Sequence, residues 1–406
     1  MKPLTMTHFT ATSCLGRGTA ATLEALRNQH SGLQPCNFET VDLQTYIGEV
    51  AGVDAIQMPP GLERFECRNN RLAYLGLTQD GFMEAVAHSS RRWGRRRIGI
   101  FLGTSTAGIL QTELAYRQRN PATGALPADF QYATTQNSFS VAAFVQSVLG
   151  IEGPRTVVCS ACSSSAKVFG TARRMIEAGV IDAAVVGGVD SLCLTTLYGF
   201  SALQLTSSQP CRPFDVARDG ISISEAAAFA LIERPSGARA EQVDLLGIGE
   251  SSDAYHMSSP HPEGVGARTA MIHALSSAGL KAEQIDYINL HGTGTQSNDS
   301  AESRAVSSVF GPETSCSSTK GATGHALGAA GALEAVICAL ALQNDLMPAG
   351  LNVSQIDPVL GLRYLRENQT GPVARVISNS FGFGGTNCAL IFGRRDASRD
   401  TGTGEA

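Results

Sequence analysis

Short apolar runs alternate with segments of helical periodicity along most of the chain. In the first half, RTVVCS (155–160) and AAVVGGV (183–189) predict two buried strands. Residues 166–178, between these two runs, predict a helix. The apolar face of this helix comprises Val168, Ala172, Met175 and Ile176. An arginine-rich stretch at 91–97 predicts a solvated helix end that leads into a strand at 98–102.

The second half repeats this alternation. IDYINL (285–290) predicts a strand, and residues 298–310 predict a helix opened by Asn and Asp. Residues 328–342 are apolar on nearly every side, which predicts a buried helix. VISNSF (376–381) and CALIF (388–392) predict two strands separated by a glycine-rich turn.

A chemically reactive residue follows a predicted strand in each half, Cys162 in the first and His291 in the second. This repetition predicts a duplicated α/β unit rather than two unrelated domains. The seam between the two units is predicted near residues 235–247, where the pattern of apolar and polar residues is weakest. We therefore predict an N-terminal half over 1–245 and a C-terminal half over 246–406, folded together because the buried helices need cover on every side.

Composition narrows the possible functions by exclusion. Of the 406 residues, 43% are hydrophobic and 17% are charged, which is typical of a globular protein. The net charge of −5 leaves no basic excess for binding nucleic acid. No apolar run reaches the roughly 20 residues of a membrane span, and the first residues lack the apolar core of a signal peptide. We expect a cytoplasmic protein without a membrane or nucleic-acid partner.

Cys162 lies in CSACSSSAK, between a predicted strand and the start of a helix. Backbone N–H groups and the positive end of the helix dipole at such a junction favour a thiolate. A single cysteine is, however, more often a small buried hydrophobe, and ten are scattered along this chain. The spacing from Cys159, predicted to lie within the strand as inert packing, also permits a redox pair.

Two histidines lie at similar junctions, His291 in LHGTGT and His325 in GATGHALG. Either one alone is more often a structural residue than a catalyst. Both are flanked by glycines, which let a ligand or the backbone approach closely. The turn NSFGFGGTN (379–387) adds free N–H groups that are suited to an oxyanion. Together these junctions predict nucleophilic acyl transfer, without indicating a substrate.

Six segments of the chain are similar, in order and spacing, to one known family. They are SACSSS, CRPFDVARDG (211–220), SSDAYHMSSP (251–260), HGTGTQSNDSAE (291–302), STKGATGHALGAAGALEA (318–335) and NSFGFGGTN (379–387). They resemble the β-ketoacyl-acyl-carrier-protein synthases, the condensing enzymes of fatty acid and polyketide synthesis. One cysteine with two histidines is similar to the type II elongating branch, whereas the initiating branch has Cys-His-Asn.

The resemblance implies a thiolase-like α/β fold of two duplicated halves stacked as α-β-α-β-α, and a dimer. It implies an acyltransferase in which Cys162 takes an acyl chain from the phosphopantetheine of an acyl carrier protein. His291 and His325 would stabilise the enolate formed when malonyl-carrier loses CO₂, and the carbanion would extend the chain by two carbons. The backbone amides of Cys162 and Phe383 would form the oxyanion hole. No cofactor or metal is implied.

Further residues of this sequence match residues that support the active site in the family. Lys320 matches the lysine of its TK element, and Glu334 matches the buried acidic partner of that lysine. Asp299 and Glu302 match acids that order the second-half site by hydrogen bonding.

Other positions match groups that contact the substrate. Thr293 and Thr295 match the threonines that hold the pantetheine arm, and Phe383 matches the aromatic gate of the acyl pocket. Thr106 lies where the family limits acyl depth, so that its small side chain would permit a longer chain.

The resemblance is weakest where a carrier protein would dock. Gln204 stands where several elongating enzymes have an arginine. Arg68 and Arg71 are candidates to meet an acidic carrier helix instead.

Alternatives to a homodimeric enzyme stay open. The chain is compatible with the active half of a heterodimer that has a chain-length-factor-like partner in a polyketide or polyene pathway. The inactive partner itself is disfavoured, because such subunits lose the cysteine. A degradative thiolase would lack the paired histidines, and a zinc or redox protein would leave them unexplained.

Overall fold

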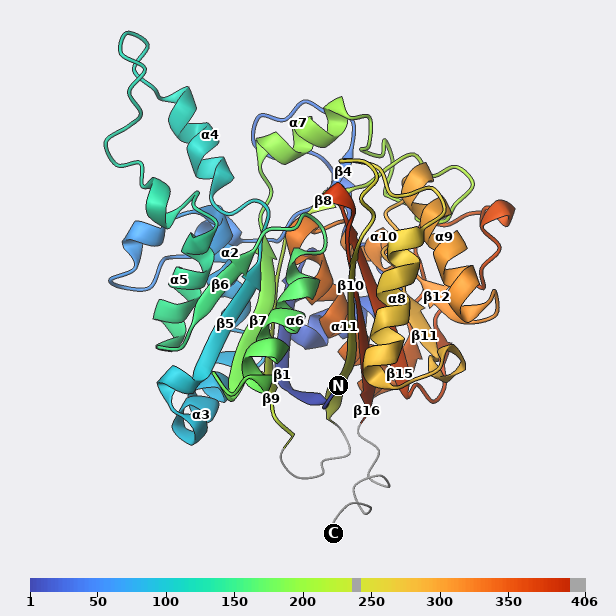
Figure 1. Ribbon diagram of the computed structural model, residues 1–406. Coiled ribbons are helices and arrows are strands. Elements are labelled where there is room, and N and C mark those ends of the chain that lie inside the picture. The colour runs from blue at the N-terminus through green and yellow to red at the C-terminus, as the bar shows by residue number, and fades with distance from the viewer. Residues whose placement is uncertain (236–241, 395–406) are drawn as a thin grey trace.

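One large sheet runs through the molecule in the computed structural model, which describes residues 1–235 and 242–394 (Figure 1). Its strand order is β12-β11-β15-β16-β10-β1-β9-β7-β5-β6, with β2 beside β1. The strands of the first half are β1 (Leu4–Ser13), β2 (Gly16–Arg17), β5 (Ile98–Gly103), β6 (Arg155–Val158), β7 (Ala183–Asp190) and β9 (Ala226–Glu233). Those of the second are β10 (Val243–Ser252), β11 (Tyr287–Asn289), β12 (Ser315–Ser317), β15 (Arg375–Gly382) and β16 (Thr386–Arg394).

The two halves of this sheet have the same topology. Counted from the middle of the sheet outwards, the strands of the first half are β1, β9, β7, β5 and β6, and those of the second half are β10, β16, β15, β11 and β12. Leaving out the short β2, the strands in each half are the first, last, fourth, second and third along the chain. In both halves the first two pairings are antiparallel and the last two are parallel. A short antiparallel pairing of β1 with β10, at Leu4 and Leu245, joins them. The expected duplication is therefore confirmed.

Helices cover this sheet in layers. They are α1 (Gly18–Arg27), α2 (Arg68–Leu77), α3 (Phe82–Trp93), α4 (Ile109–Arg117), α5 (Phe139–Leu149), α6 (Ser164–Glu177), α7 (Leu194–Ala202), α8 (Val265–Ala278), α9 (Gln296–Phe310), α10 (Lys320–Thr323) and α11 (Ala330–Asn344). Helices α6 and α11 pack on each other and touch strands of both halves, so they lie between the two sheet halves. Helices α2, α3 and α5 cover the first half and α8 covers the second, which gives the expected five layers (Figure 1).

Within residues 1–235 and 242–394, five short strands lie outside the main sheet. They are β3 (Gln34–Pro35), β4 (Tyr46–Gly48), β8 (Ile223–Ser224), β13 (Leu346–Met347) and β14 (Gln369–Thr370). Strands β4 and β8 pair with each other, so Ile47 lies opposite Ile223. Ile223 comes two residues before the buried Glu225.

Most of the predicted elements are confirmed, and two details are wrong. The strand predicted over 155–160 ends at Val158 and is only half-buried, because β6 is an edge strand. Cys159 consequently lies beyond the strand and is exposed, rather than packed inside it. Part of the predicted seam, residues 236–241, lies outside the described residues. The boundary at 245/246 falls within β10, and the division into 1–245 and 246–406 stays a prediction.

The segment Leu327–Asn344 is long and apolar enough to cross a membrane. However, 89% of it is buried inside the protein, between the two sheet halves. Its apolar surface is therefore accounted for by the core.

Candidate active site

Cys162 lies in the sharp turn between β6 and α6. The residue before it, Ala161, has a φ of 50°, and α6 begins at Ser164, two residues after Cys162. The left-handed backbone at Ala161 is uncommon for a residue with a Cβ, and it turns the chain abruptly. The thiol is only 6% exposed.

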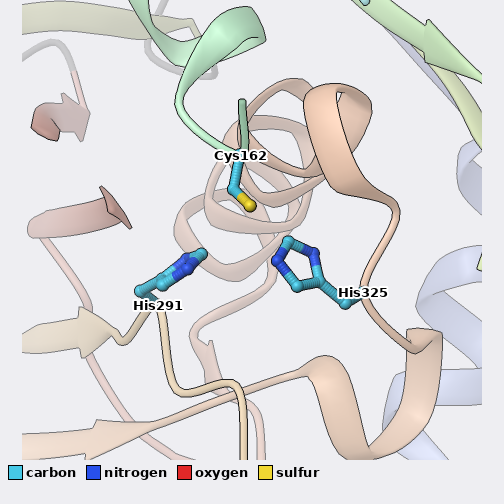
Figure 2. Close-up of side chains that lie close together, drawn as sticks. All are labelled: Cys162, His291 and His325. Atoms are coloured by element: carbon cyan, nitrogen blue, oxygen red, sulfur yellow. The ribbon is translucent and has the colours of Figure 1, made fainter. Parts of the chain in front are cut away.

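Two histidines from the second half face this thiol (Figure 2). His291 follows β11, and His325 follows α10. The sulfur of Cys162 and one ring nitrogen of each histidine lie within 4.8 Å of one another. The two imidazole rings meet edge to face, with centroids 5.3 Å apart. The structure thus brings together the three residues that the sequence singled out, at the junction of the two halves.

Both histidines have Nδ1 occupied by a hydrogen-bond donor. The Leu327 amide donates to Nδ1 of His325 at 3.2 Å, and Lys320 Nζ lies 3.4 Å from Nδ1 of His291. A ring nitrogen that accepts carries no proton, so each neutral imidazole holds its proton on Nε2. Burial, followed by the charge of Lys320, lowers the pKa of both histidines well below the usual value. Both are therefore neutral donors through Nε2.

Lys320 is fixed behind His291 by a buried acid. Its side chain is 1% exposed, and it is ion-paired with Glu334 at 2.5 Å. It also donates to the carbonyl oxygen of His291 at 2.6 Å. Burial raises the pKa of Glu334, and the charge of Lys320 opposes that effect. The predicted Lys320–Glu334 partnership is present in the structure.

Two buried carboxylates hold the HGTGT turn in place. Glu302 accepts the backbone N–H groups of His291 at 2.8 Å and Gly292 at 2.7 Å. Asp299 accepts the N–H of Thr293 at 3.1 Å and of the following Gly294 at 3.2 Å. Each carboxylate satisfies amides that the tight turn would otherwise leave unpaired. This is the ordering by hydrogen bonds that the resemblance implies.

A cavity of about 60 Å³ opens beside the three reactive groups. Thr293 and Thr295 line it, with their hydroxyl groups 3.0 Å apart. Phe383 lines it as well, half-buried, with its ring centroid 5.6 Å from that of Phe200. Thr106 does not line this cavity; it is buried, and its hydroxyl donates to Asp190. Its role in limiting acyl depth stays a prediction.

Two loops meet over the cavity. The first includes Asp253 and Met257, and the second includes Gly384 and Gly385. Asp253 donates its backbone N–H to Gly385 at 2.8 Å, and Gly384 donates its own to Met257 at 2.7 Å. Gly384 has a φ of 80°, a conformation that glycine adopts without strain. These contacts place Phe383 beside Cys162.

The ionisation of the thiol differs from the sequence-based expectation. A helix start favours a thiolate, but burial raises the pKa of Cys162 to about 11. The charge of Lys320 and a hydrogen bond from the backbone N–H of Phe383 lower this pKa, and the charge of Asp190 raises it. Desolvation outweighs the local donors, so Cys162 rests as a thiol.

The expectation for Arg68 as a carrier contact is wrong. Arg68 is 4% exposed and is ion-paired with Glu225 at 2.6 Å, Asp54 at 2.7 Å and Glu49 at 3.1 Å. Arg71 is 26% exposed and pairs with Glu66 and Asp54. Buried and fully paired, Arg68 has no face left for another protein.

Sequence reasoning missed three residues around the site. Phe200 lines the cavity from α7, Leu327 bonds to His325, and Asp190 lies at the end of β7. Phe200 sits in an unremarkable helical segment without a motif. Asp190 did carry a signal, because it is a charged residue directly after the apolar run AAVVGGV (183–189), at the end of a fully buried strand.

A thiol and two imidazoles within 4.8 Å also form a donor set that Zn²⁺ can bind. Zinc favours four ligands, and this group in the described part of the chain offers three. Lys320 places a positive charge against His291, which disfavours a second cation there. The absence of a metal stays a prediction.

Two family models match the chain. One, described as β-ketoacyl synthase, N-terminal domain, matches residues 68–238, and the other, β-ketoacyl synthase, C-terminal domain, matches 243–354. Among curated proteins, the mitochondrial 3-oxoacyl-acyl-carrier-protein synthase of Arabidopsis thaliana is 39% identical over 262 residues. That match covers 60% of this chain and 57% of the plant protein, so the chain spans less than two thirds of that relative.

Solved structures show the same similarity over nearly the whole chain. A ketosynthase in complex with its chain length factor from Xenorhabdus doucetiae is 36% identical, with a TM-score of 0.88, and the match covers 97% of this chain and 98% of that one. The ishigamide ketosynthase/chain length factor is 27% identical, with a TM-score of 0.88, covering 97% of this chain and 100% of that one. The thiolase-like fold expected from the sequence is confirmed.

Proposed function

This chain belongs to the β-ketoacyl synthase family, and we propose that it is a β-ketoacyl-acyl-carrier-protein synthase, an acyltransferase that extends an acyl chain by two carbons. The observation that carries this proposal is the position of the Cys162 sulfur opposite two neutral imidazoles, each with Nδ1 occupied. A thiol with two aligned N–H donors suits acyl transfer followed by enolate formation.

In the first step, Cys162 sulfur attacks the thioester carbonyl of an acyl-carrier. The thiol proton passes to the departing carrier sulfur, and the acyl chain remains as a thioester on Cys162. The backbone N–H groups of Cys162 and Phe383, which donate toward this sulfur, would stabilise the oxyanion. Phosphopantetheine of the carrier would lie along Thr293 and Thr295 at the cavity wall.

In the second step, malonyl-carrier loses CO₂, and the electron pair of the broken C–C bond remains on the carrier thioester as an enolate. Nε2–H of His291 and of His325 donates to the developing oxyanion on the thioester oxygen. The enolate carbon attacks the acyl carbonyl on Cys162, the sulfur leaves, and it regains a proton from solvent. The product is a 3-ketoacyl-carrier longer by two carbons. The chemistry requires no cofactor, and a cytoplasmic location is part of this proposal.

The intact mass of the purified protein tests the first step. After exposure to a panel of acyl-carrier thioesters, the unmutated chain should gain the mass of one acyl group, and Cys162→Ser should gain none. The preferred adduct would identify the chain length that the cavity accepts. Condensation retained in Cys162→Ala would contradict the proposal.

The second step is tested with His291→Ala and His325→Ala. Each should lower the decarboxylation of malonyl-carrier on the order of 100-fold or more, while Cys162 still accepts an acyl group. Normal decarboxylation in both variants would show that the histidines do not stabilise the enolate.

A second candidate is the active half of a heterodimer. The structures from Xenorhabdus doucetiae and of the ishigamide system are both described as a ketosynthase with a chain length factor. In this chain, the half-buried edge strand β6 adjoins α5, and large apolar side chains are exposed at the start of α5 and beside it, at Phe139 and Tyr132. Such a surface suits a second subunit, either another copy or a related partner.

The native mass of the purified chain distinguishes these forms. A dimer that becomes acylated by itself supports the homodimer. A monomer that acquires acylation only after addition of a chain-length-factor subunit supports the heterodimer.

A further inference from the structure

Asp190 is a fully buried carboxylate at the point where the two halves of the site meet. It is the last residue of β7 and is 0% exposed. Five of its hydrogen bonds come from the loop after β5 in the same half. The donors are the hydroxyls of Thr104 at 2.7 Å, Ser105 at 2.5 Å and Thr106 at 2.9 Å, and the backbone N–H groups of Ser105 at 2.7 Å and Thr106 at 2.9 Å.

The sixth hydrogen bond crosses to the other half. The backbone N–H of Gly328 donates to Oδ2 of Asp190 at 2.6 Å. Gly328 lies three residues after His325, in the turn before α11. A Cβ at Gly328 would lie 2.8 Å from Oδ2 and 2.9 Å from the backbone nitrogen of Ser105. A side chain at this position would therefore have to push Asp190 or the Ser105 backbone aside.

The residue between His325 and Gly328 that matters most is Leu327. Its φ of 48° is in the left-handed region, which is unfavourable for a leucine. In this conformation its N–H points back to Nδ1 of His325 at 3.2 Å. A strained residue keeps its conformation only where its surroundings hold it. The hydrogen bond to Asp190 holds the very next amide in the chain.

We propose that Asp190 is a positioning residue for His325. Its carboxylate anchors the Gly328 amide to the first half of the site, which keeps the strained Leu327 in place and its N–H on Nδ1 of His325. The imidazole proton thereby stays on Nε2, facing Cys162. Asp190 acts through the turn and does not touch the substrate. The inference rests on the proposed function for its kinetic test, while the tautomer of His325 can be tested independently.

Asp190→Asn is the direct test, because an asparagine side chain accepts hydrogen bonds only through its oxygen, whereas aspartate accepts them through both oxygens. We expect the decarboxylation of malonyl-carrier to fall on the order of 100-fold, since small displacements of a catalytic group cost that much. The KM for malonyl-carrier and the acylation of Cys162 should change by no more than about threefold. Asp215→Asn is the matched control. Asp215 is also 0% exposed, and among the described residues the hydrogen bonds to its carboxylate come from Ala217, Ser354 and Gln355 rather than from the turn after His325.

A merely structural role is excluded by repeating the substitution in a His325→Ala background. If Asp190 acts through His325, the residual decarboxylation rate should be the same with and without Asp190→Asn. An equal fold-loss in both backgrounds would overturn the proposal.

Nitrogen-15 spectra of histidine-labelled protein report the tautomer of His325 directly and do not depend on enzyme activity. Unmutated protein should show His325, assigned by its loss in His325→Ala, as the Nε2–H tautomer alone, and Asp190→Asn should show both tautomers. If Asp190→Asn does not fold, Gly328→Ala disturbs the same contact and should give the same spectrum. An unchanged tautomer in these variants would overturn the proposal. If unmutated protein fails to decarboxylate malonyl-carrier, the proposed function fails, and the spectra still decide the role of Asp190.

Discussion

Lys320 Nζ donates to the backbone carbonyl of His291 at 2.6 Å and lies 3.4 Å from Nδ1 of the same residue. One ammonium group therefore fixes both the main chain and the ring of a histidine that faces Cys162. The same charge lowers the pKa of His291 and of Cys162. A single buried cation thus keeps the imidazole neutral and favours the thiolate form of Cys162.

Replacing Lys320 by methionine should affect both activity and stability. Decarboxylation of malonyl-carrier should fall at least tenfold, because His291 loses the group that sets its tautomer. The free energy of unfolding should fall by about 3–5 kcal/mol, because Glu334 is left buried without its partner. Urea denaturation and a carrier decarboxylation assay measure the two effects.

The double variant Lys320→Met with Glu334→Leu separates these effects. Removing both charges should restore most of the stability, since no unpaired ion remains. Activity should stay low. Full activity in the double variant would show that the ammonium has no role beyond packing.

The alkylation of Cys162 by iodoacetamide should depend steeply on pH. Burial raises the pKa of this thiol to about 11, and only the thiolate reacts. The alkylation rate should therefore rise about tenfold per pH unit between pH 7 and 10 without levelling off. Cys162→Ala identifies the background from the exposed Cys159. A plateau near pH 7 would mean that the helix start governs the thiol after all.

The elements, and the three residues that meet at the site, were predictable because their signals are local. The strand around β7 and the helix α6 show in the spacing of apolar residues, and glycines mark the turns at His291 and His325. Repetition of these signals in both halves predicted the duplication. The topology confirms that prediction strand by strand.

What could not be predicted depends on partners far away in the sequence. Arg68 looked like a surface charge, but its buried partner Glu225 is 157 residues distant. The thiol of Cys162 looked activated, but burial raises its pKa, and the cavity beside it is lined by distant residues such as His291 and Phe383. The role proposed for Asp190 depends on hydrogen bonds from two other loops, at Ser105 and Gly328. Local patterns report periodicity and turns, whereas burial and charge pairing follow from the tertiary fold.

Glu302 should contribute a pH-dependent term to stability. Burial raises the pKa of Glu302 to about 7, although the donated N–H groups of Gly292 and His291 lower it. The folded state then binds a proton more tightly than the unfolded state, so the contribution is lost as pH rises from about 4.5 through 7. Its size is about 3 kcal/mol for a buried carboxyl with this pKa.

Urea denaturation between pH 4.5 and 8 tests this sign by comparison with Glu302→Gln. The variant should be less stable at pH 5, because an amide cannot replace both accepted N–H bonds. The gap between the two proteins should narrow as the pH rises. A gap that is constant across this range, or one that widens, would contradict the raised pKa.

Arg68→Ala and Arg71→Ala form a matched pair that separates stability from carrier binding. Arg68→Ala leaves Glu225, which is 0% exposed, without its cation, so the free energy of unfolding should fall by about 3–5 kcal/mol. Arg71→Ala removes a partly exposed pair with Asp54 and Glu66, and should cost no more than about 1 kcal/mol. Neither substitution should change the KM for the acyl-carrier by more than about twofold where the protein is folded, because Arg68 is enclosed and Arg71 is engaged by two carboxylates. A large rise in KM with unchanged stability for Arg68→Ala would place this arginine at the docking surface and contradict its buried role.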